Sequence, residues 1–329
     1  MNYDHLTEKK ARLGALRPLP AAQLRNLESW FRVELTYTSN AIEGNTLTRA
    51  ETAMVVEKGL TVGGKTLTEH LEASNHVAAL DWVREQVKRP SRSLTQRDIL
   101  TIHEMILKGI DEENAGRYRN IVVRISGSMV VLPNPRKVPD LMDEFERWLT
   151  QPPEAIHPVE LAAEAHYRLV TIHPFTDGNG RAARLLMNMI LTMHGYPPAI
   201  IRPRDRIAYL NALEKGQTGG PKDDYHLLIS KAAERSLDIY LKTAANEELE
   251  EESGTSEALL TIGKLAAATG TVNSTIRHWV KTGLLEVAET TPAGYQLFDH
   301  AMIERAYRIR ALQDKRLTLA EIKRELSGE

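Results

Sequence analysis

The residues best able to do chemistry fall within one short stretch, HPFTDGNGRAAR, at positions 173–184. His173 carries the side chain whose ordinary pKa suits proton abstraction near neutral pH. Asp177 offers a carboxylate of the kind that holds Mg²⁺ together with phosphate oxygens. The Gly-Asn-Gly sequence at 178–180 comes just before a predicted helix, where backbone N–H groups can point together at an anion. The stretch therefore predicts a phosphate site with a carboxylate and a base beside it.

Two arginines open the helix that follows this loop. Arg181 and Arg184 are three residues apart in its first turn, so they share one helix face. The helix macrodipole and their mutual repulsion both oppose this arrangement. A bound polyanion would offset both effects, and the planar guanidinium group can bind two phosphate oxygens at once. We therefore expect a polyphosphate ligand rather than a purely structural loop.

Helical periodicity dominates the segments that must position these side chains. Apolar residues recur at steps of three and four. They predict helices over residues 21–37, 68–87, 95–108, 138–150 and 157–170. The strongly apolar segment after Gly180 predicts a further helix that ends at Gly195, just before two prolines. Residues 120–132 break the pattern, since two β-branched runs flank a turn with Gly127 and predict a short β-hairpin.

The composition limits the class of protein. The chain has 329 residues, with 42 Lys+Arg against 44 Asp+Glu and no cysteine. This length predicts two domains, and the lack of cysteine excludes disulfides, thiolate zinc sites and cysteine nucleophiles. The near-neutral charge gives no overall nucleic-acid footprint. The N-terminal MNYDHLTEKK is too polar for a signal peptide and the most apolar helix is too short to cross a bilayer, so we expect a cytoplasmic protein with no membrane partner.

An acidic, apolar-poor stretch, NEELEEESGTS, begins at Asn246 and is typical of a linker. It predicts a chain of four regions. These are an N-terminal helical region at 1–90, a central domain with the phosphate site at 91–245, the acidic linker at 246–257 and a second domain at 258–329.

The stretch at 173–184 resembles the signature of the Fic (filamentation-induced-by-cAMP) family, HxFx(D/E)GNGRxxR, at every fixed position. AGRYR at 115–119, LPNP at 132–135 and RLLMNMILTMHGYPP at 184–198 extend the resemblance to roughly residues 20–240. It implies an all-α Fic fold with a small β-hairpin flap, which can pair with an extended target segment. It also implies a protein adenylyltransferase, which transfers AMP from ATP to a Ser, Thr or Tyr hydroxyl of a target protein.

The resemblance also assigns a role to each residue of the motif. The assignments are His173 as the base, Asp177 as the Mg²⁺ ligand, Gly178, Asn179 and Gly180 as the anion-binding loop, Arg181 and Arg184 as ligands of the β- and γ-phosphates, and Asn188 as a neighbour of the nucleoside. The implied ligands are therefore ATP and Mg²⁺.

A second motif, SNAIEGN at 39–45, matches the family's inhibitory motif (S/T)xxxE(G/N) through Ser39 and Glu43. The resemblance implies that Glu43 reaches the active site and pairs with Arg184. Because Arg184 cannot serve a carboxylate and a γ-phosphate at once, ATP would bind with its α-phosphate misaligned for attack. The same glutamate could activate a water for the reverse reaction, the removal of AMP.

Residues 258–329 resemble a MerR-type winged helix-turn-helix domain through TIGKLAAATG, TIRHW, GYQLF and LAEIKREL. In that family the second helix enters the major groove, which makes Thr275 and Arg277 candidates for DNA contact. The domain also departs from the family pattern, for example in its charge and in its wing. Residues 257–329 hold ten Lys+Arg against nine Asp+Glu, and the wing has Gln296 where arginine is usual.

Several alternatives stay open at this stage. A Fic enzyme could use another phosphate donor or work chiefly as a de-adenylylase. The chain could instead be a DNA-binding regulator whose Fic domain only senses nucleotide. The second domain could dock a protein in place of DNA, and a homodimer through the catalytic domain is expected by resemblance only.

Overall fold

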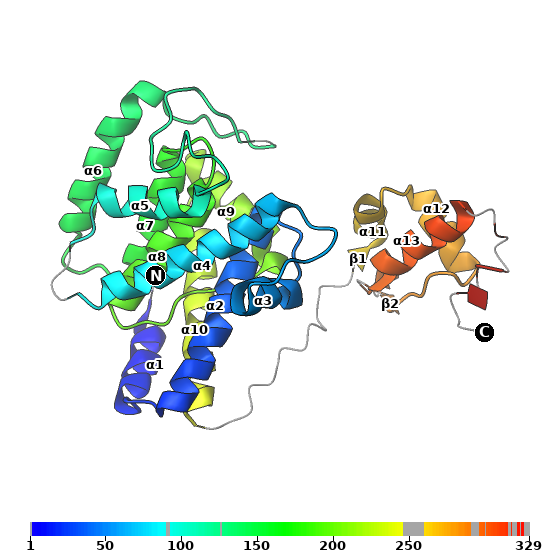
Figure 1. Cartoon of the computed structure of the whole chain (residues 1–329), viewed down its shortest axis with the longest axis horizontal. Coiled ribbons are helices and arrows are strands. Elements are labelled where there is room, and N and C mark those ends of the chain that lie inside the picture. Colours follow the sequence, from blue (N-terminus) through cyan, green and yellow to red (C-terminus); the bar gives the residue numbers. More distant parts are fainter. Residues whose placement is uncertain are drawn as a thin grey trace. The chain divides into compact units, whose positions relative to one another are not determined.

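The structure is a computed structural model that describes residues 2–89, 93–125, 127–245, 260–290, 296–299, 301–314, 317, 321–322 and 324–325. Its contacts divide the chain into two units, Met1–Leu249 and Glu250–Glu329, and Figure 1 shows both units with their main elements labelled. The predicted acidic linker at 246–257 falls outside the described residues.

Over its described residues, the first unit consists of helices and loops without a strand. The elements are α1 (Asp4–Ala15), α2 (Ala21–Glu43), α3 (Arg49–Lys58), α4 (Leu67–Val87), α5 (Gln96–Leu107), η1 (Pro135–Lys137), α6 (Val138–Thr150), α7 (Pro158–Ile172), α8 (Asn179–Met193), η2 (Pro203–Asp205), α9 (Arg206–Gln217) and α10 (Asp223–Ala244). The expected all-α class is confirmed, and each helix predicted from periodicity is present.

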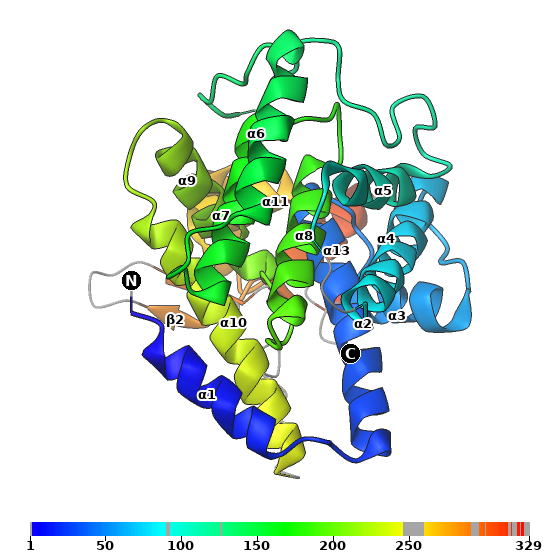
Figure 2. The ribbon, with the colours of Figure 1, turned by 90° about the vertical axis from the view of Figure 1, so that its left-hand side faces the viewer.

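Helix α8 forms the centre of the first unit, and α2, α4, α5 and α7 pack around it (Figure 2). Its apolar residues face every direction, and Leu185, Leu186 and Ile190 are at most 1% exposed. A helix that is apolar all round belongs in a core. Arg181 and Arg184 are therefore buried charges, 2% and 4% exposed, which need partners inside the protein.

Helix α2 continues to Glu43, beyond the end predicted at residue 37. The additional turn carries buried polar residues, Ser39 and Asn40, so the apolar pattern stopped before the helix did. Gly44 ends the helix in the left-handed conformation, at φ +103°, which costs glycine little. This length brings the end of α2 alongside α8.

The segment at 120–132 contains the predicted turn but no strand pairing. The amide of Ser128 donates to the carbonyl of Ile125 (3.2 Å), and Gly127 takes φ +76°, as a tight turn requires. None of the described residues on either side belongs to a strand. An isolated two-stranded hairpin is only marginally stable, and here the apolar side chains are not packed: Val131 is 93% exposed.

The second unit has the arrangement of a winged helix-turn-helix. Its elements are β1 (Leu260–Thr261), α11 (Ile262–Thr269), α12 (Asn273–Lys281), β2 (Glu289–Thr290), β3 (Gln296–Phe298) and α13 (Ala301–Asp314). Strands β1 and β2 both pair antiparallel with β3, in the order β1–β3–β2. Gly270 ends α11 at φ +61° and makes the turn into α12. Trp279 and Phe298 belong to a core that is separate from that of the first unit.

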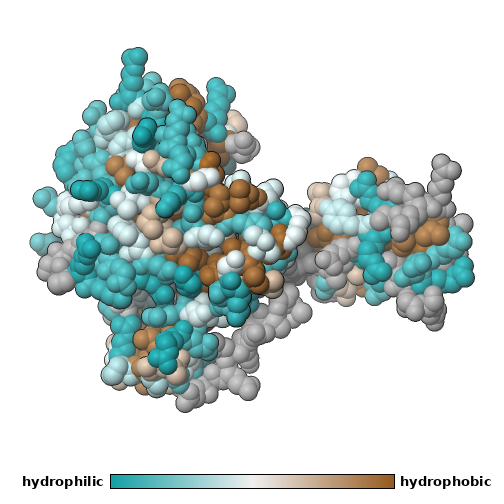
Figure 3. Space-filling model, viewed as in Figure 1, coloured by the Kyte–Doolittle hydropathy of each residue, from teal (hydrophilic) through white to brown (hydrophobic). Residues whose placement is uncertain are grey.

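The surface of the first unit is mainly hydrophilic, with apolar patches over α3 and the start of α4 (Figure 3). Met54, Leu60 and Leu67, from this part of the chain, have exposed side chains. Gathered apolar side chains of this kind are typical of surfaces that meet a partner. None of the helices that the structure describes is both long and apolar enough to span a bilayer.

Candidate active site

The loop that joins α7 to α8 is fixed by its own side chains. His173 ends α7 in the left-handed conformation, at φ +50°, and its amide donates to the carbonyl of Leu169 (2.9 Å). The Asn179 side chain accepts from the N–H of Phe175 (3.0 Å) and donates to its carbonyl (2.9 Å). Phe175 is fully buried and anchors the loop in the core. The Asn179 side chain therefore shapes the loop, which leaves its backbone N–H for an anion.

Helix α8 begins without a capping side chain, and no acidic residue lies in its first turn. The first N–H groups of a helix have no partner within it. Gly178 has φ +75°, and a β-carbon there would come within 3.1 Å of Ile106 Cδ1, so only glycine fits. A β-carbon on Gly180 would lie 2.3 Å from Oε1 of Glu43. The carboxylate that lies against this helix N-terminus is thus that of Glu43.

Arg184 is bound by the end of α2. Its Nε donates to Ser39 Oγ (3.0 Å), and its Nη2 donates to the Ser39 carbonyl (2.9 Å) and to Glu43 Oε1 (2.7 Å). Burial opposes the charge of Arg184, but the Glu43 carboxylate and the Tyr209 hydroxyl together outweigh burial and raise the pKa of the guanidinium. The structure therefore brings together both residues of the predicted inhibitory motif and the second arginine of the phosphate loop.

The end of α2 is itself held in place by α9. The Nε of Arg206, the first residue of α9, donates to the carbonyl of Ile42 (2.6 Å). A cation is favourable at a helix C-terminus, where carbonyl groups lack partners. No sequence pattern indicated this contact, which fixes the residue next to Glu43.

Arg181 is neutralised by two carboxylates. Its Nη1 donates to Glu72 Oε1 (2.8 Å) and its Nη2 donates to Asp177 Oδ2 (3.0 Å). The other oxygen of Glu72 accepts from Asn45 Nδ2 (2.8 Å), which links the turn after α2 to this pair. The Nε of Arg181 is buried and has no acceptor among the described residues. Glu72 was not among the residues predicted for the site, because an isolated glutamate on a predicted helix carries no distinguishing signal.

His103 of α5 supports the Asp177 backbone, although it was not among the residues predicted for the site. Its Nε2 donates to the Asp177 carbonyl (3.0 Å), and its Nδ1 accepts from the N–H of Gly116 (3.0 Å). Its ring stacks on Phe175 with 3.6 Å between centroids. Burial lowers the pKa of His103 to about 4, so the ring is neutral at pH 7. The Asp177 side chain itself is 69% exposed and can reach a ligand.

Arg119 ties the loop to the segment at 120–132. Its Nε donates to the His173 carbonyl (2.7 Å), its Nη1 to the Ile121 carbonyl (3.1 Å) and its Nη2 to the Pro133 carbonyl (2.7 Å). Its own N–H donates to the carbonyl of Pro174 (2.8 Å). One buried side chain thus joins His173 to both ends of the flap segment. In the sequence Arg119 stood out only as part of AGRYR.

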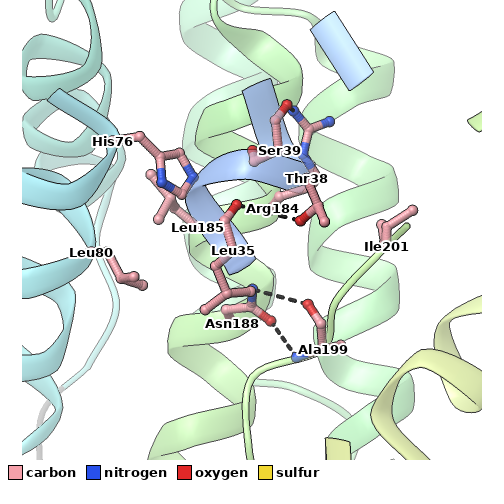
Figure 4. A pocket seen from close by; sticks show the side chains of 10 residues that line it. All are labelled: Leu35, Thr38, Ser39, His76, Leu80, Arg184, Leu185, Asn188, Ala199 and Ile201. Atoms are coloured by element: carbon pink, nitrogen blue, oxygen red, sulfur yellow. Dashed lines mark hydrogen bonds between the residues drawn. The ribbon is translucent and has the colours of Figure 1, made fainter. Parts of the chain in front are cut away.

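Asn188 lies one turn beyond Arg184 on α8 and lines a cavity of about 10 Å³ with it (Figure 4). Its Nδ2 donates to the Ala199 carbonyl (3.2 Å) and its Oδ1 accepts from the Ala199 N–H (2.8 Å). A cavity of this size has room for about one water molecule. The Asn188 amide therefore fixes the segment after α8, and its contact with a nucleoside stays a prediction.

The two candidates for DNA contact lie on α12. Arg277 is exposed together with His278 and Lys281, whereas Thr275 is half-buried. The opposite face of the helix carries buried Trp279. Helix α12 therefore presents a polar face that carries the two cationic side chains of Arg277 and Lys281.

Comparison with known proteins finds a matching family for each of the two units. A model of the Fic/DOC family matches residues 93–191, and a model of the MerR HTH family of regulatory proteins matches residues 260–329. A protein adenylyltransferase Fic from Nematostella vectensis is 39% identical over 239 residues, which are 72% of this chain and 55% of that protein. One from Culex quinquefasciatus is 36% identical over 240 residues, with 73% and 47% covered. The chain thus spans about half the length of the curated relatives it matches.

Solved structures show the same fold. A Fic domain containing signaling protein from Bacteroides thetaiotaomicron superposes with a TM-score of 0.68 and 32% identity, over 75% of this chain and 99% of that one. Fic-1 from C. elegans gives a TM-score of 0.64 and 31% identity, over 73% and 72%. With the phosphate loop, the buried arginine pair and a glutamate of α2 in one site, this chain belongs to the Fic family.

Proposed function

We propose that the first unit transfers AMP from ATP to a hydroxyl side chain of a target protein, and that Glu43 restrains this activity. The observation that carries the proposal is the carboxylate of Glu43, which binds Arg184 at the uncapped N-terminus of α8. A carboxylate there occupies a place suited to a phosphate group. The names of the matched relatives, protein adenylyltransferase Fic, support the same reaction.

The phosphate groups of ATP would bind at the start of α8. Arg181 contributes a buried Nε that has no acceptor among the described residues, and a phosphate oxygen would satisfy it. Arg184 would exchange Glu43 for the γ-phosphate. The free N–H groups of the first turn would stabilise the charge that develops on the α-phosphate.

Mg²⁺ belongs to this proposal, and the donor set fits it. Asp177 offers one exposed carboxylate beside Arg181. The described part of the chain contains no group of three His, Cys, Asp or Glu side chains that could hold a metal by themselves. Mg²⁺ commonly takes one or two carboxylates and completes its shell with substrate phosphates and water. Asp177 would hold the ion, which would neutralise charge on the phosphates.

The proton step would fall to His173. Burial lowers the pKa of His173, so its ring is neutral at pH 7. Its Nδ1 lies 3.4 Å from the carbonyl of Val170, which favours the proton on Nδ1 and leaves Nε2 as the acceptor. The target hydroxyl oxygen would attack the α-phosphorus, the bond from that phosphorus to the bridging oxygen would break, and pyrophosphate would leave. The hydroxyl proton would pass to Nε2.

Mass spectrometry of the whole chain, incubated with ATP and Mg²⁺, tests the proposal. Glu43→Gly should yield AMP adducts where the parent chain yields few, because Arg184 becomes available to the nucleotide. Arg184→Ala in the same chain should abolish the gain, and Glu28→Gly, in the same helix but near its other end, should behave as the parent. If Glu43→Gly forms no adduct, the proposal is wrong. If the parent chain removes AMP from a modified protein, the reverse reaction is favoured.

We further propose that the second unit contacts DNA through α12. The exposed Arg277, His278 and Lys281 form a polar face on the helix that enters the major groove in helix-turn-helix proteins. The match to MerR HTH regulators over residues 260–329 supports this choice over protein docking. Region boundaries at 90 and 245, and a homodimer through the catalytic domain, stay predictions.

A further inference from the structure

A chain of buried hydroxyl and imidazole groups runs behind Arg184. Tyr209 of α9, His166 of α7 and Tyr225 of α10 are each at most 1% exposed. The Tyr209 hydroxyl lies 2.8 Å from His166 Nε2, and the Tyr225 hydroxyl lies 2.8 Å from His166 Nδ1. The Tyr225 hydroxyl donates to the Ala163 carbonyl (2.9 Å). At its other end this series of groups reaches Arg184, whose guanidinium group interacts electrostatically with the Tyr209 hydroxyl.

The number of protons fixes the direction of every bond in this chain. Tyr225 gives its only hydroxyl proton to Ala163, so it must accept from the Nδ1–H of His166. Burial lowers the pKa of His166 to about 3, so the ring is neutral and its Nε2 accepts from the Tyr209 hydroxyl. Tyr209 then has only lone pairs left to offer, and they face a guanidinium group that can only donate. Each of the three recorded hydrogen bonds, from Tyr209 to His166, from His166 to Tyr225 and from Tyr225 to Ala163, thus has one donor and one acceptor.

We propose that Tyr209 and His166 are positioning residues that hold Arg184 in the orientation needed for the γ-phosphate, whether or not Glu43 is bound. This inference rests on the proposed function. The other partners of Arg184, Ser39 and Glu43, both belong to α2. The side chains of Tyr209, His166 and Tyr225 belong to α9, α7 and α10 instead. This hydrogen-bonded series would therefore stay in place when the carboxylate of Glu43 withdraws. An arginine that is already oriented loses less entropy when a phosphate binds.

Calorimetric titration of the full chain with ATP and with ADP, each with Mg²⁺, tests the inference in the Glu43→Gly background. Tyr209→Phe removes one hydroxyl and leaves the ring. It should weaken ATP about tenfold and leave ADP nearly unchanged, because ADP lacks the γ-phosphate. In an Arg184→Ala background, Tyr209→Phe should not change the ratio of ATP to ADP affinity, since the group it positions is gone.

A second pair of variants separates positioning from packing. His166→Gln keeps an acceptor for Tyr209 and a donor for Tyr225, so it should retain most of the preference for ATP over ADP. His166→Leu fills the space without either group and should lose that preference. If Tyr209→Phe does not fold, as judged by its thermal unfolding, this pair still decides the question.

The possible failures are distinguishable. If the Glu43→Gly chain binds neither ATP nor ADP, the proposed function is wrong, and the inference is overturned with it. If that chain binds both nucleotides, but Tyr209→Phe weakens them equally or not at all, the proposed function survives and the positioning role is overturned. Equal behaviour of His166→Gln and His166→Leu would also overturn it.

Discussion

Arg181 and Arg184 place two positive charges in the core of the first unit. The carboxylates that neutralise them come from different elements of the fold. Asp177 is local, whereas Glu72 comes from α4 and Glu43 from α2. Removing one partner of a buried ion pair leaves an uncompensated charge, which is strongly destabilising. Glu43 therefore compensates the buried charge of Arg184, and under the proposed function it would also keep a phosphate group away from that arginine.

This double role predicts a stability change that ATP reverses. Glu43→Gly should lower the melting temperature of the first unit, because Arg184 loses its carboxylate. ATP with Mg²⁺ should raise the melting temperature of the variant by several degrees and that of the parent chain much less, since a ligand that binds the folded state stabilises it more as its affinity rises. Differential scanning fluorimetry at matched nucleotide concentrations measures this. Equal shifts in both proteins would contradict the exchange of carboxylate for phosphate.

A substitution at His173 separates chemistry from binding. We choose His173→Asn because the backbone there is left-handed, a conformation that asparagine tolerates better than most residues. Transfer in the Glu43→Gly background should fall by about 10²–10⁴-fold, the usual loss for a positioned base, while ATP affinity changes little. His194→Ala, at the opposite end of α8, is the matched control. Retained transfer by His173→Asn would exclude His173 as the base.

At the scale of elements, the site lies where the end of α2 meets the start of α8. Gly44 ends α2 and Gly178 begins α8, both in left-handed conformations, so the two termini are sharply defined. The flap segment is held by side chains rather than by strand pairing. Arg119 binds its two ends, and the amide of Met129 near its tip donates to Glu214 Oε1 (2.8 Å) of α9.

Arg119 should therefore be essential for the shape of both the loop and the flap. Arg119→Lys keeps the charge but cannot reach three carbonyl groups in different directions. It should lower the free energy of unfolding by about 2–4 kcal/mol, because buried carbonyl oxygens lose their donors. Urea unfolding measures the change, and Arg117→Lys, an exposed arginine in the same AGRYR segment, should stay within about 0.5 kcal/mol of the parent. Equal stability of the two variants would refute the role of Arg119.

At the scale of the whole molecule, buried histidines set the response of the first unit to acid. Burial lowers the pKa of His76 to about 3, of His103 to about 4 and of His166 to about 3. In the unfolded chain these rings bind a proton below the ordinary histidine pKa of about 6.5. In the folded protein they stay neutral over most of that range. Their contribution to stability is complete above pH 6.5 and is lost as the pH falls towards 3.

Acid should therefore destabilise the first unit well before its carboxylates titrate. At pH 5.5 each of the three histidines should lower the free energy of unfolding by about 1.4 kcal/mol, and the three together by about 4 kcal/mol. Glu69 and Glu164 have pKa values lowered to about 2, so their effect begins only below the ordinary range of glutamate, near pH 4.5. Urea unfolding at pH 7.5 and 5.5 measures the difference. An unchanged midpoint would show that these rings are not buried in neutral form.

We expect the second unit to bind DNA with a modest, salt-dependent affinity. Its near-balanced charge implies few phosphate contacts, and the salt dependence of binding scales at about −0.9 per contact, so its slope should be shallow. Fluorescence anisotropy of the whole chain with duplex DNA at low salt should detect binding. Arg277→Ala should weaken it, while Arg305→Ala, whose guanidinium binds the Leu284 carbonyl, should act mainly on stability. If the chain binds no duplex and loses target modification when α12 is altered, protein docking is the better function.

The sequence by itself placed the candidate side chains of the loop close together and predicted the helices around it. His173, Asp177, Arg181 and Arg184 lie within one short stretch of chain, and the resemblance to the Fic family assigned their expected roles. The apolar periodicity is also a local signal, and it predicted α6 with both of its ends, Val138 and Thr150. Ser39 and Glu43 were identified through a resemblance, because neither periodicity nor charge marks them.

Only the tertiary structure decided which distant groups complete the site. Glu72, His103 and Arg119 are ordinary residues on their own elements, and contacts across 109, 74 and 54 positions of sequence give them their roles. Among its described residues the flap segment likewise forms no strand, and Arg119 holds its two ends. The physical reason is that burying Arg181 and Arg184 requires compensating groups on whichever helices pack against α8, and helix packing is fixed by the whole core rather than by any one segment.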